Sequence, residues 1–342
     1  VMWALFGYSL AFGGNHGGII GDFRWFGLEG IGWNVGPYAD SIPNLVFCAF
    51  QMMFAIITPA LITGAVVGRM RFKALFIFIA LWSLGGLLAE LGSVDFAGGD
   101  VVHISSGVTA LVLAIVLGRR KGYERMTYRI HNIPFVVLGA TILWFGWFGF
   151  NAGSALKADG LAAHAFMTSA ISSAAALLVN DKKTTLVGAS TGLVLGLVAI
   201  TPGAGFVPIW ASFIIGALVS PICYYGVILV KKKLKIDDAL DAFGCHGIGG
   251  IWGGIATGIF GKSSINSVAK WDGLVYGEWR LFAAQIEGIL ITIAIAVVGT
   301  LICVGIVRIF TPLRVTDREE KLGLDISQHG ESAYPSFNGM DQ

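Results

Sequence analysis

The chain has 342 residues, of which 55% are hydrophobic and only 13% are charged, and its formal net charge is +2. A soluble domain carries about a quarter charged residues, so this composition excludes an ordinary soluble domain and indicates an integral membrane protein. Long continuous apolar runs exclude a β-barrel, whose strands would give short alternating segments. The 48 glycines are typical of closely packed membrane helices.

The apolar segments follow one another along the whole chain and are long enough to form membrane helices. The first of them is only the end of a helix, and a polar tail follows the last. In chain order, the predicted spans are residues 1–13, 44–68, 74–93, 95–119, 133–150, 161–179, 185–200, 207–230, 243–260 and 281–307. We therefore predict an all-α, polytopic membrane protein.

Basic residues orient these spans in the bilayer. Clusters of Lys and Arg fall at every second junction, at residues 69–73, 119–129, 182–183, 231–235 and 308–314, whereas the alternate junctions hold few. Positively charged loops stay in the cytoplasm. We therefore predict a multi-pass protein of the cell (inner) membrane with a cytoplasmic C-terminal tail.

Two spans open on similar polar stretches that contain a histidine. Residues 95–107 lead into one apolar run and contain Asp95, several glycines and His103, and residues 241–254 open another with Asp241 and His246. The charge pattern makes the two spans run in opposite directions. This is the relation that an inverted repeat produces, and it favours a site near the midplane between the two halves.

The residues alone leave several interpretations of these histidines open. A histidine in an apolar helix often only packs, but two in counterpart positions favour a function. Neutral imidazoles can exchange hydrogen bonds with a small polar solute. A metal site is a rival interpretation, although neither aspartate stands one helical turn from its histidine. Aromatic residues near the span ends form either a lipid-interface belt or a site for a small cation.

Four ordered motifs and the tail resemble the ammonium transporter (Amt/Mep/Rh) family, and bacterial and archaeal Amt proteins most closely. The motifs are residues 94–107 (with Val94 where the family has Leu), 146–155, 200–207 and 241–250, and the tail segment is 323–334. The resemblance covers essentially the whole chain. It implies an eleven-helix inverted repeat of five plus five helices and one more, assembled as a homotrimer with one pore per subunit.

The resemblance also assigns roles to individual residues. His103 and His246 match the family's pair of pore histidines, and Phe54 and Phe150 match the rings that gate the outer entrance. Phe50 and Ser154 match residues of the outer recruitment site for ammonium. Asp95 matches a buried aspartate that supports that region, and Asp241 matches an acid near the cytoplasmic side.

These matches imply a transporter rather than an enzyme, with no cofactor and no metal. Ammonium would be recruited outside and deprotonated at the Phe gate, and ammonia would pass the histidines, with the proton following separately if transport is electrogenic. Residues 1–310 would form the transmembrane domain and residues 311–342 a cytoplasmic tail that serves a trimeric P-II signalling protein. Lipid is the other expected partner, and nucleic acid is not one. An ammonium sensor and a passive channel for a neutral gas are the alternatives.

Three departures from the family are visible. The family's first helix and most of its second have no counterpart, so we expect the natural chain to begin earlier. The sequence is also shorter than the family between Leu84 and Gly85, where a Trp of the outer cation site is expected, and near Val179 and Asn180. We expect these to be segments missing from this sequence rather than true deletions.

Overall fold

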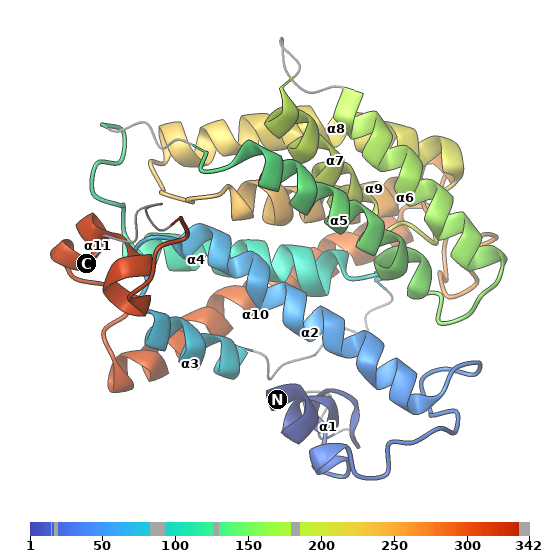
Figure 1. Cartoon of the computed structure of the whole chain (residues 1–342). Helices are drawn as coiled ribbons and strands as arrows, with labels where there is room; N and C mark the ends of the chain where they lie inside the picture. The colour runs from blue at the N-terminus through green and yellow to red at the C-terminus, as the bar shows by residue number, and fades with distance from the viewer. Residues whose placement is uncertain (15, 17–19, 83–92, 126–129, 179–184, 335–342) are drawn as a thin grey trace.

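Long helices lie side by side, and the short helix α11 packs at one end of them (Figure 1). The computed structural model describes residues 1–14, 16, 20–82, 93–125, 130–178 and 185–334. Within these ranges the chain forms helices, turns and three isolated bridges but no strand. The shortenings expected near Leu84 and Val179 lie outside the described residues.

Most of the longer helices agree with the predicted spans to within a few residues. The α-helix expected over 95–119 begins only at Ser105, because residues 99–104 form a π-helical segment, and for the span expected over 74–93 the structure describes helix as far as Trp82. The longer helices are α2 (Asn44–Val66), α3 (Phe72–Trp82), α4 (Ser105–Leu117), α5 (Ile133–Gly153), α6 (Gly160–Leu178), α7 (Leu186–Ile200), α8 (Ile209–Ile228), α9 (Ile248–Phe260) and α10 (Arg280–Phe310). Short helices α1 (Tyr8–Phe12) and α11 (Asp317–Leu322) flank them. α10 extends three residues beyond its predicted end, and α3 reaches the last described residue before the gap.

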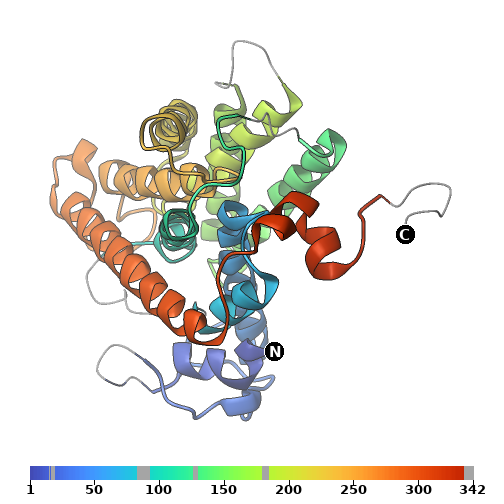
Figure 2. The same ribbon diagram turned by 90° about the vertical axis from the view of Figure 1, so that its left-hand side faces the viewer.

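Length and hydropathy allow six of the described helical segments to cross a membrane. They are Asn44–Val66, Gly99–Leu117, Ile133–Gly153, Gly160–Leu178, Ile209–Lys233 and Arg280–Phe310. The last, which contains α10, is the longest at 31 residues and the most apolar, with a mean hydropathy of 2.8. It slants across one side of the bundle when the molecule is turned (Figure 2).

Local sequence signals explain where several helices begin. Asn132 accepts a hydrogen bond from the Phe135 amide at the start of α5, and Thr185 caps α7 in the same way through Gly188. α11 opens with a reciprocal capping box between Thr316 and Glu319. These caps fix the helix starts at polar positions that flank the apolar runs.

The two histidine-bearing spans have the same internal construction. A π-helical turn, η3 (Gly99–Ile104), precedes the 13-residue helix α4, and a π-helical turn, η5 (Phe243–Gly247), precedes the 13-residue helix α9. The two segments cross at Gly107, where an added Cβ would lie 2.2 Å from the Gly247 amide nitrogen. Glycine therefore sets the distance between the two backbones.

The substitution Gly107→Ala should separate this crossing and destabilise the protein by about 1–3 kcal/mol, because the added methyl group meets backbone rather than a movable side chain. The measurement is the apparent melting temperature of the purified protein in detergent. Gly139→Ala on α5 is the matched control, since nothing lies within 4 Å of its added Cβ. Equal melting temperatures for the two variants would contradict the tight crossing.

Candidate functional site

His103 and His246 meet at the centre of the bundle although 143 residues separate them in sequence. Their Nδ1 atoms are 3.3 Å apart, and their rings are stacked with centroids 5.2 Å apart. Both are buried, His103 completely. A hydrogen bond between two Nδ1 atoms needs one donor and one acceptor, so one ring carries a proton at this position and the other does not.

A carboxylate holds the start of each histidine-bearing segment. Asp95 accepts hydrogen bonds from four successive backbone amides, Gly98 to Val101, at 2.6–3.4 Å. Asp238 accepts from the amides of Ala242 and Phe243 at 3.0 and 2.7 Å. Each of these aspartates stands eight residues before its histidine. The helix starts are thus satisfied by side chains in the same way on both sides of the pair.

Asp241, the acid singled out from the sequence, lies beside the second of these segments. It forms an ion pair with Lys231 at 2.6 Å, and its backbone adopts a left-handed conformation with φ of 58°. Its carbonyl accepts from the Cys245 amide. Asp241 therefore contacts the first turn of η5 through its backbone, whereas the carboxylate that caps this turn belongs to Asp238.

A column of aromatic rings leads from the end of the bundle opposite α11 to His103. The centroids of Phe50 and Phe54 are 5.0 Å apart, and those of Phe54 and Phe150 are 4.6 Å apart. Phe150 in turn lies 6.0 Å from the His103 ring, with the two planes nearly parallel. Phe50, Phe54 and Phe150 therefore form a continuous series of ring contacts with the histidines, edge-on or tilted between the phenylalanines and stacked from Phe150 through His103 to His246.

Ser154 stands at the Phe50 end of this column, next to Gly153, whose added Cβ would lie 3.1 Å from the Phe50 ring. Its hydroxyl donates to the Phe150 carbonyl at 2.8 Å, so its oxygen keeps lone pairs that can accept a hydrogen bond. The adjacent ring faces attract a small cation. At the inner end, Nε2 of His103 is buried without a hydrogen-bond partner. The column can thus present an acceptor and ring faces at its mouth and imidazole nitrogens at its centre.

Three residues of this region were not singled out from the sequence. Trp147 stacks on the His103 ring at 5.3 Å and is 2% exposed. Asp238 was missed because it precedes the motif of residues 241–250. Its spacing of eight residues from His246 equals the spacing of Asp95 from His103. Asp100 is 3% exposed, and its Oδ1 has no partner. An acid inside an apolar run is itself a signal of a special role.

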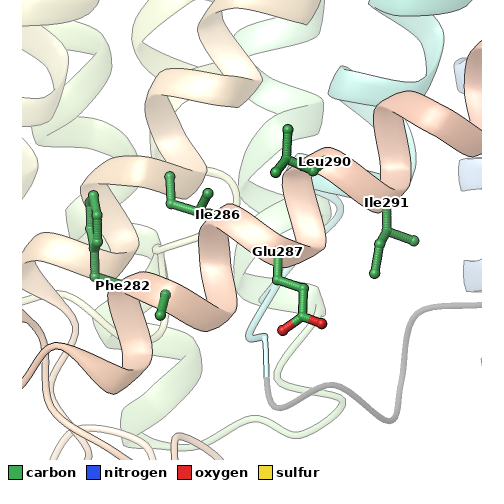
Figure 3. A pocket seen from close by; sticks show the side chains of 6 residues that line it. Phe282, Ile286, Glu287, Leu290 and Ile291 are labelled. Carbon is green, nitrogen blue, oxygen red and sulfur yellow. The ribbon is translucent and has the colours of Figure 1, made fainter.

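A groove of about 570 Å³ lies elsewhere, on the surface of α10 (Figure 3). Its lining comes from this one helix and is apolar except for Glu287. The paired histidines and the aromatic column do not border it. We therefore assign the candidate site to the narrow ring column rather than to this groove.

The α11 end of the bundle contains a network of arginines and carboxylates. Asp237 accepts from Arg120 at 2.7–2.9 Å and pairs with Arg69 at 3.2 Å. Arg314 donates to the carbonyls of Leu117 and Arg119 at 2.7 Å, at the end of α4. This network joins the end of the His103 helix to the segment that precedes His246.

Burial alone would raise the pKa of Asp237, but the hydrogen bonds from Arg120 and the charge of Arg69 lower it overall. Burial raises the pKa of the neighbouring Asp238 despite its two backbone hydrogen bonds. The two adjacent carboxyls therefore differ in their environment: one is held by cations and the other by the start of a helix.

Known proteins match this chain over nearly its whole length. The sequence profile of the Ammonium Transporter Family matches residues 1–334. An ammonium transporter of Bacillus subtilis is 48% identical over 353 residues, which cover 98% of this chain and 86% of that protein. The crystal structure of Saccharomyces cerevisiae Mep2 matches with a TM-score of 0.84 and 34% identity, over 93% of this chain and 78% of that one.

A solved structure described as a sensor Amt protein also matches, with a TM-score of 0.81 and 27% identity over 96% of this chain and 86% of that chain. Together these similarities confirm the predicted family and the all-α membrane fold.

We expect Asp237→Asn to destabilise the protein by about 3–5 kcal/mol, because it leaves buried arginines without their counterion. Chemical or thermal unfolding in detergent at neutral pH measures this loss. Asp241→Asn is the matched control, since its partly exposed pair with Lys231 should contribute at most about 1 kcal/mol.

The same variant also carries a pH signature. A lowered pKa in the folded protein means that the stabilisation is present above the ordinary aspartate pKa of about 3.9 and is lost as pH falls through the lowered value. Acidification across this window should therefore destabilise the wild type more than Asp237→Asn. If acidification destabilised both proteins equally, Asp237 would be excluded as the source of the pH dependence.

Proposed function

This chain belongs to the Ammonium Transporter Family, and we propose that it transports ammonium by separating ammonia from its proton along the ring column. The observation that carries the proposal is the contact between His103 and His246 at the buried end of the series of phenylalanine rings. The proposed steps are recruitment, deprotonation and passage along the histidines.

Recruitment would take place at Ser154 and Phe50. A hydrated ammonium ion can donate one hydrogen bond to the Ser154 oxygen and make cation–π contacts with the ring faces of Phe50 and Phe150. Potassium has a similar charge but no hydrogen-bond donor. The mouth would therefore favour ammonium before any chemistry occurs.

Deprotonation would follow where Phe54 and Phe150 close the column. Their centroids are 4.6 Å apart, so a hydrated ion must lose its water to go further. An isolated cation in an apolar interior is far more costly than neutral ammonia. The N–H bond that breaks leaves its electron pair on nitrogen, the proton passes to Nε2 of His103, which then releases its Nδ1 proton to Nδ1 of His246, and ammonia moves inward. Potassium has no proton to release and would be rejected here.

The two histidines would then conduct both products. Ammonia can accept or donate hydrogen bonds at their nitrogens, and the Nδ1–Nδ1 contact offers a path along which a proton can pass from ring to ring. Ammonia and proton recombine at the other side. One positive charge then crosses for each ammonium, and transport is electrogenic.

We also propose that the α11 end faces the cytoplasm of a cell (inner) membrane. Basic segments from three separate junctions meet there, at Arg69, Arg120 and Arg314, as expected for loops retained inside. Residues 1–310 would be the membrane domain and residues 311–342 the cytoplasmic tail. The family resemblance supports a homotrimer and a P-II signalling protein as partners.

A sensor is the second candidate, and the similarity to the sensor Amt structure favours it over a gas channel. In this case ammonium would bind at the mouth without net transport. The two functions share the recruitment site and differ in whether current and ammonium cross the membrane.

We expect an ammonium jump to drive a saturable current through the reconstituted protein on a supported membrane, and His103→Ala to reduce it at least about 10-fold. The alanine removes both the Nδ1 contact and the free Nε2. His164→Ala is the matched control, because His164 lies on α6, outside the pair, and its ring contacts the Val207 carbonyl.

Ammonium uptake into vesicles is measured in parallel. Uptake without current would replace the electrogenic mechanism by passage of neutral ammonia. Ammonium binding with neither current nor uptake would establish the sensor, and an undiminished current in His103→Ala would overturn the role of the histidine pair.

A further inference from the structure

The Trp147 ring stacks on the His103 ring, and the buried hydroxyl of Thr201 accepts a hydrogen bond from Trp147. The centroid of the Trp147 ring lies 5.3 Å from that of the His103 ring, and the two planes make an angle of 19°. The Trp147 Nε1–H donates to the Thr201 hydroxyl at 3.0 Å. Both residues are buried, Thr201 completely.

The hydrogen bonds continue away from the column through three helices. Thr201, which follows the end of α7, donates to the Leu197 carbonyl at 2.8 Å and lies 3.4 Å from the Asn151 Oδ1 atom. The Asn151 amide, one turn after Trp147 on α5, donates to Ser169 of α6 at 2.8 Å. Asn151 and Ser169 are also 0% exposed. The chain therefore joins α5, α6 and α7 behind the ring.

We propose that Thr201 is a positioning residue that sets the plane of the Trp147 ring, and through it the orientation of the His103 imidazole. This proposal rests on the transport function proposed above. Stacking alone lets a ring slide and rotate, whereas the indole N–H bond selects one orientation. The stacked imidazole then keeps its Nδ1 directed at His246 Nδ1 and its Nε2 free.

The energetic argument favours this over simple packing. Without the Thr201 hydroxyl, the buried indole N–H loses its acceptor, and an unsatisfied buried donor is unfavourable. The ring can recover part of this cost only by turning toward another acceptor. The imidazole that stacks on it loses its fixed orientation at the same time. A role in the passage along the histidines should therefore change the maximum rate and leave recruitment at Ser154 unaltered.

The test compares Thr201→Val with Thr201→Ser in the reconstituted protein, by both ammonium-driven current and ammonium uptake. Valine keeps the shape and removes the hydroxyl, and serine restores it. We expect Thr201→Val to lower the maximum rate at least about 10-fold with half-saturation unchanged within about twofold, and Thr201→Ser to regain at least half of the wild-type rate. Thr292→Val is the matched control, since this buried hydroxyl donates to the Gly288 carbonyl of its own helix and, among the described residues, has no other hydrogen-bond partner.

A second variant tests the same bond from its other end. Trp147→Phe keeps a stacking ring but has no N–H, so adding Thr201→Val to it should cause little further loss. This non-additivity also serves if Thr201→Val alone does not fold.

The inference is overturned if Thr201→Val transports like Thr292→Val, if serine fails to restore the rate, or if the two losses add. If transport by the wild type depends on His103 but Thr201→Val transports normally, only the positioning role of Thr201 is refuted. A wild type that transports nothing refutes the proposed function.

Discussion

The hydrogen bond between the two imidazoles depends on a close approach of two distant parts of the chain. The Nδ1 atoms are 3.3 Å apart, and the segments that carry them cross almost backbone to backbone at Gly107, where a side chain would collide with the backbone of Gly247. Each ring must also face its partner. The carboxylates of Asp95 and Asp238 bind the first turns of the two segments, and the Trp147 ring stacks on His103. Much of the surrounding structure therefore supports this one contact.

The distribution of charge follows from the cost of burying ions. Asp238 is buried and Asp95 is half-buried, and each accepts hydrogen bonds from backbone amides at the start of a helical segment rather than pairing with a cation. Asp237 is buried among arginines at the α11 end. The ring column between these carboxylates is lined by side chains without formal charge. A polar solute in this column therefore meets hydrogen-bonding groups at its mouth and its centre.

The sequence predicted much of this arrangement and missed identifiable parts of it. Apolar runs and basic junctions gave the spans because hydropathy is a local property. His103, His246, Phe54 and Phe150 could be named from motifs, and the structure brings them together. Trp147 could not be ranked above its neighbouring aromatic residues, because its partner Thr201 is distant in sequence. Asp238 was detectable by its eight-residue spacing, but the quoted motif began at Asp241.

Both histidines lie in π-helical turns, which contain more residues per turn than an α-helix. Such a turn is equivalent to one inserted residue in an otherwise regular helix. Deleting a residue there would restore α-helical geometry and change the direction of the side chains within the turn, the histidine among them. The direction in which each imidazole points is thus encoded by residue count as well as residue type, so this region should tolerate substitutions better than length changes.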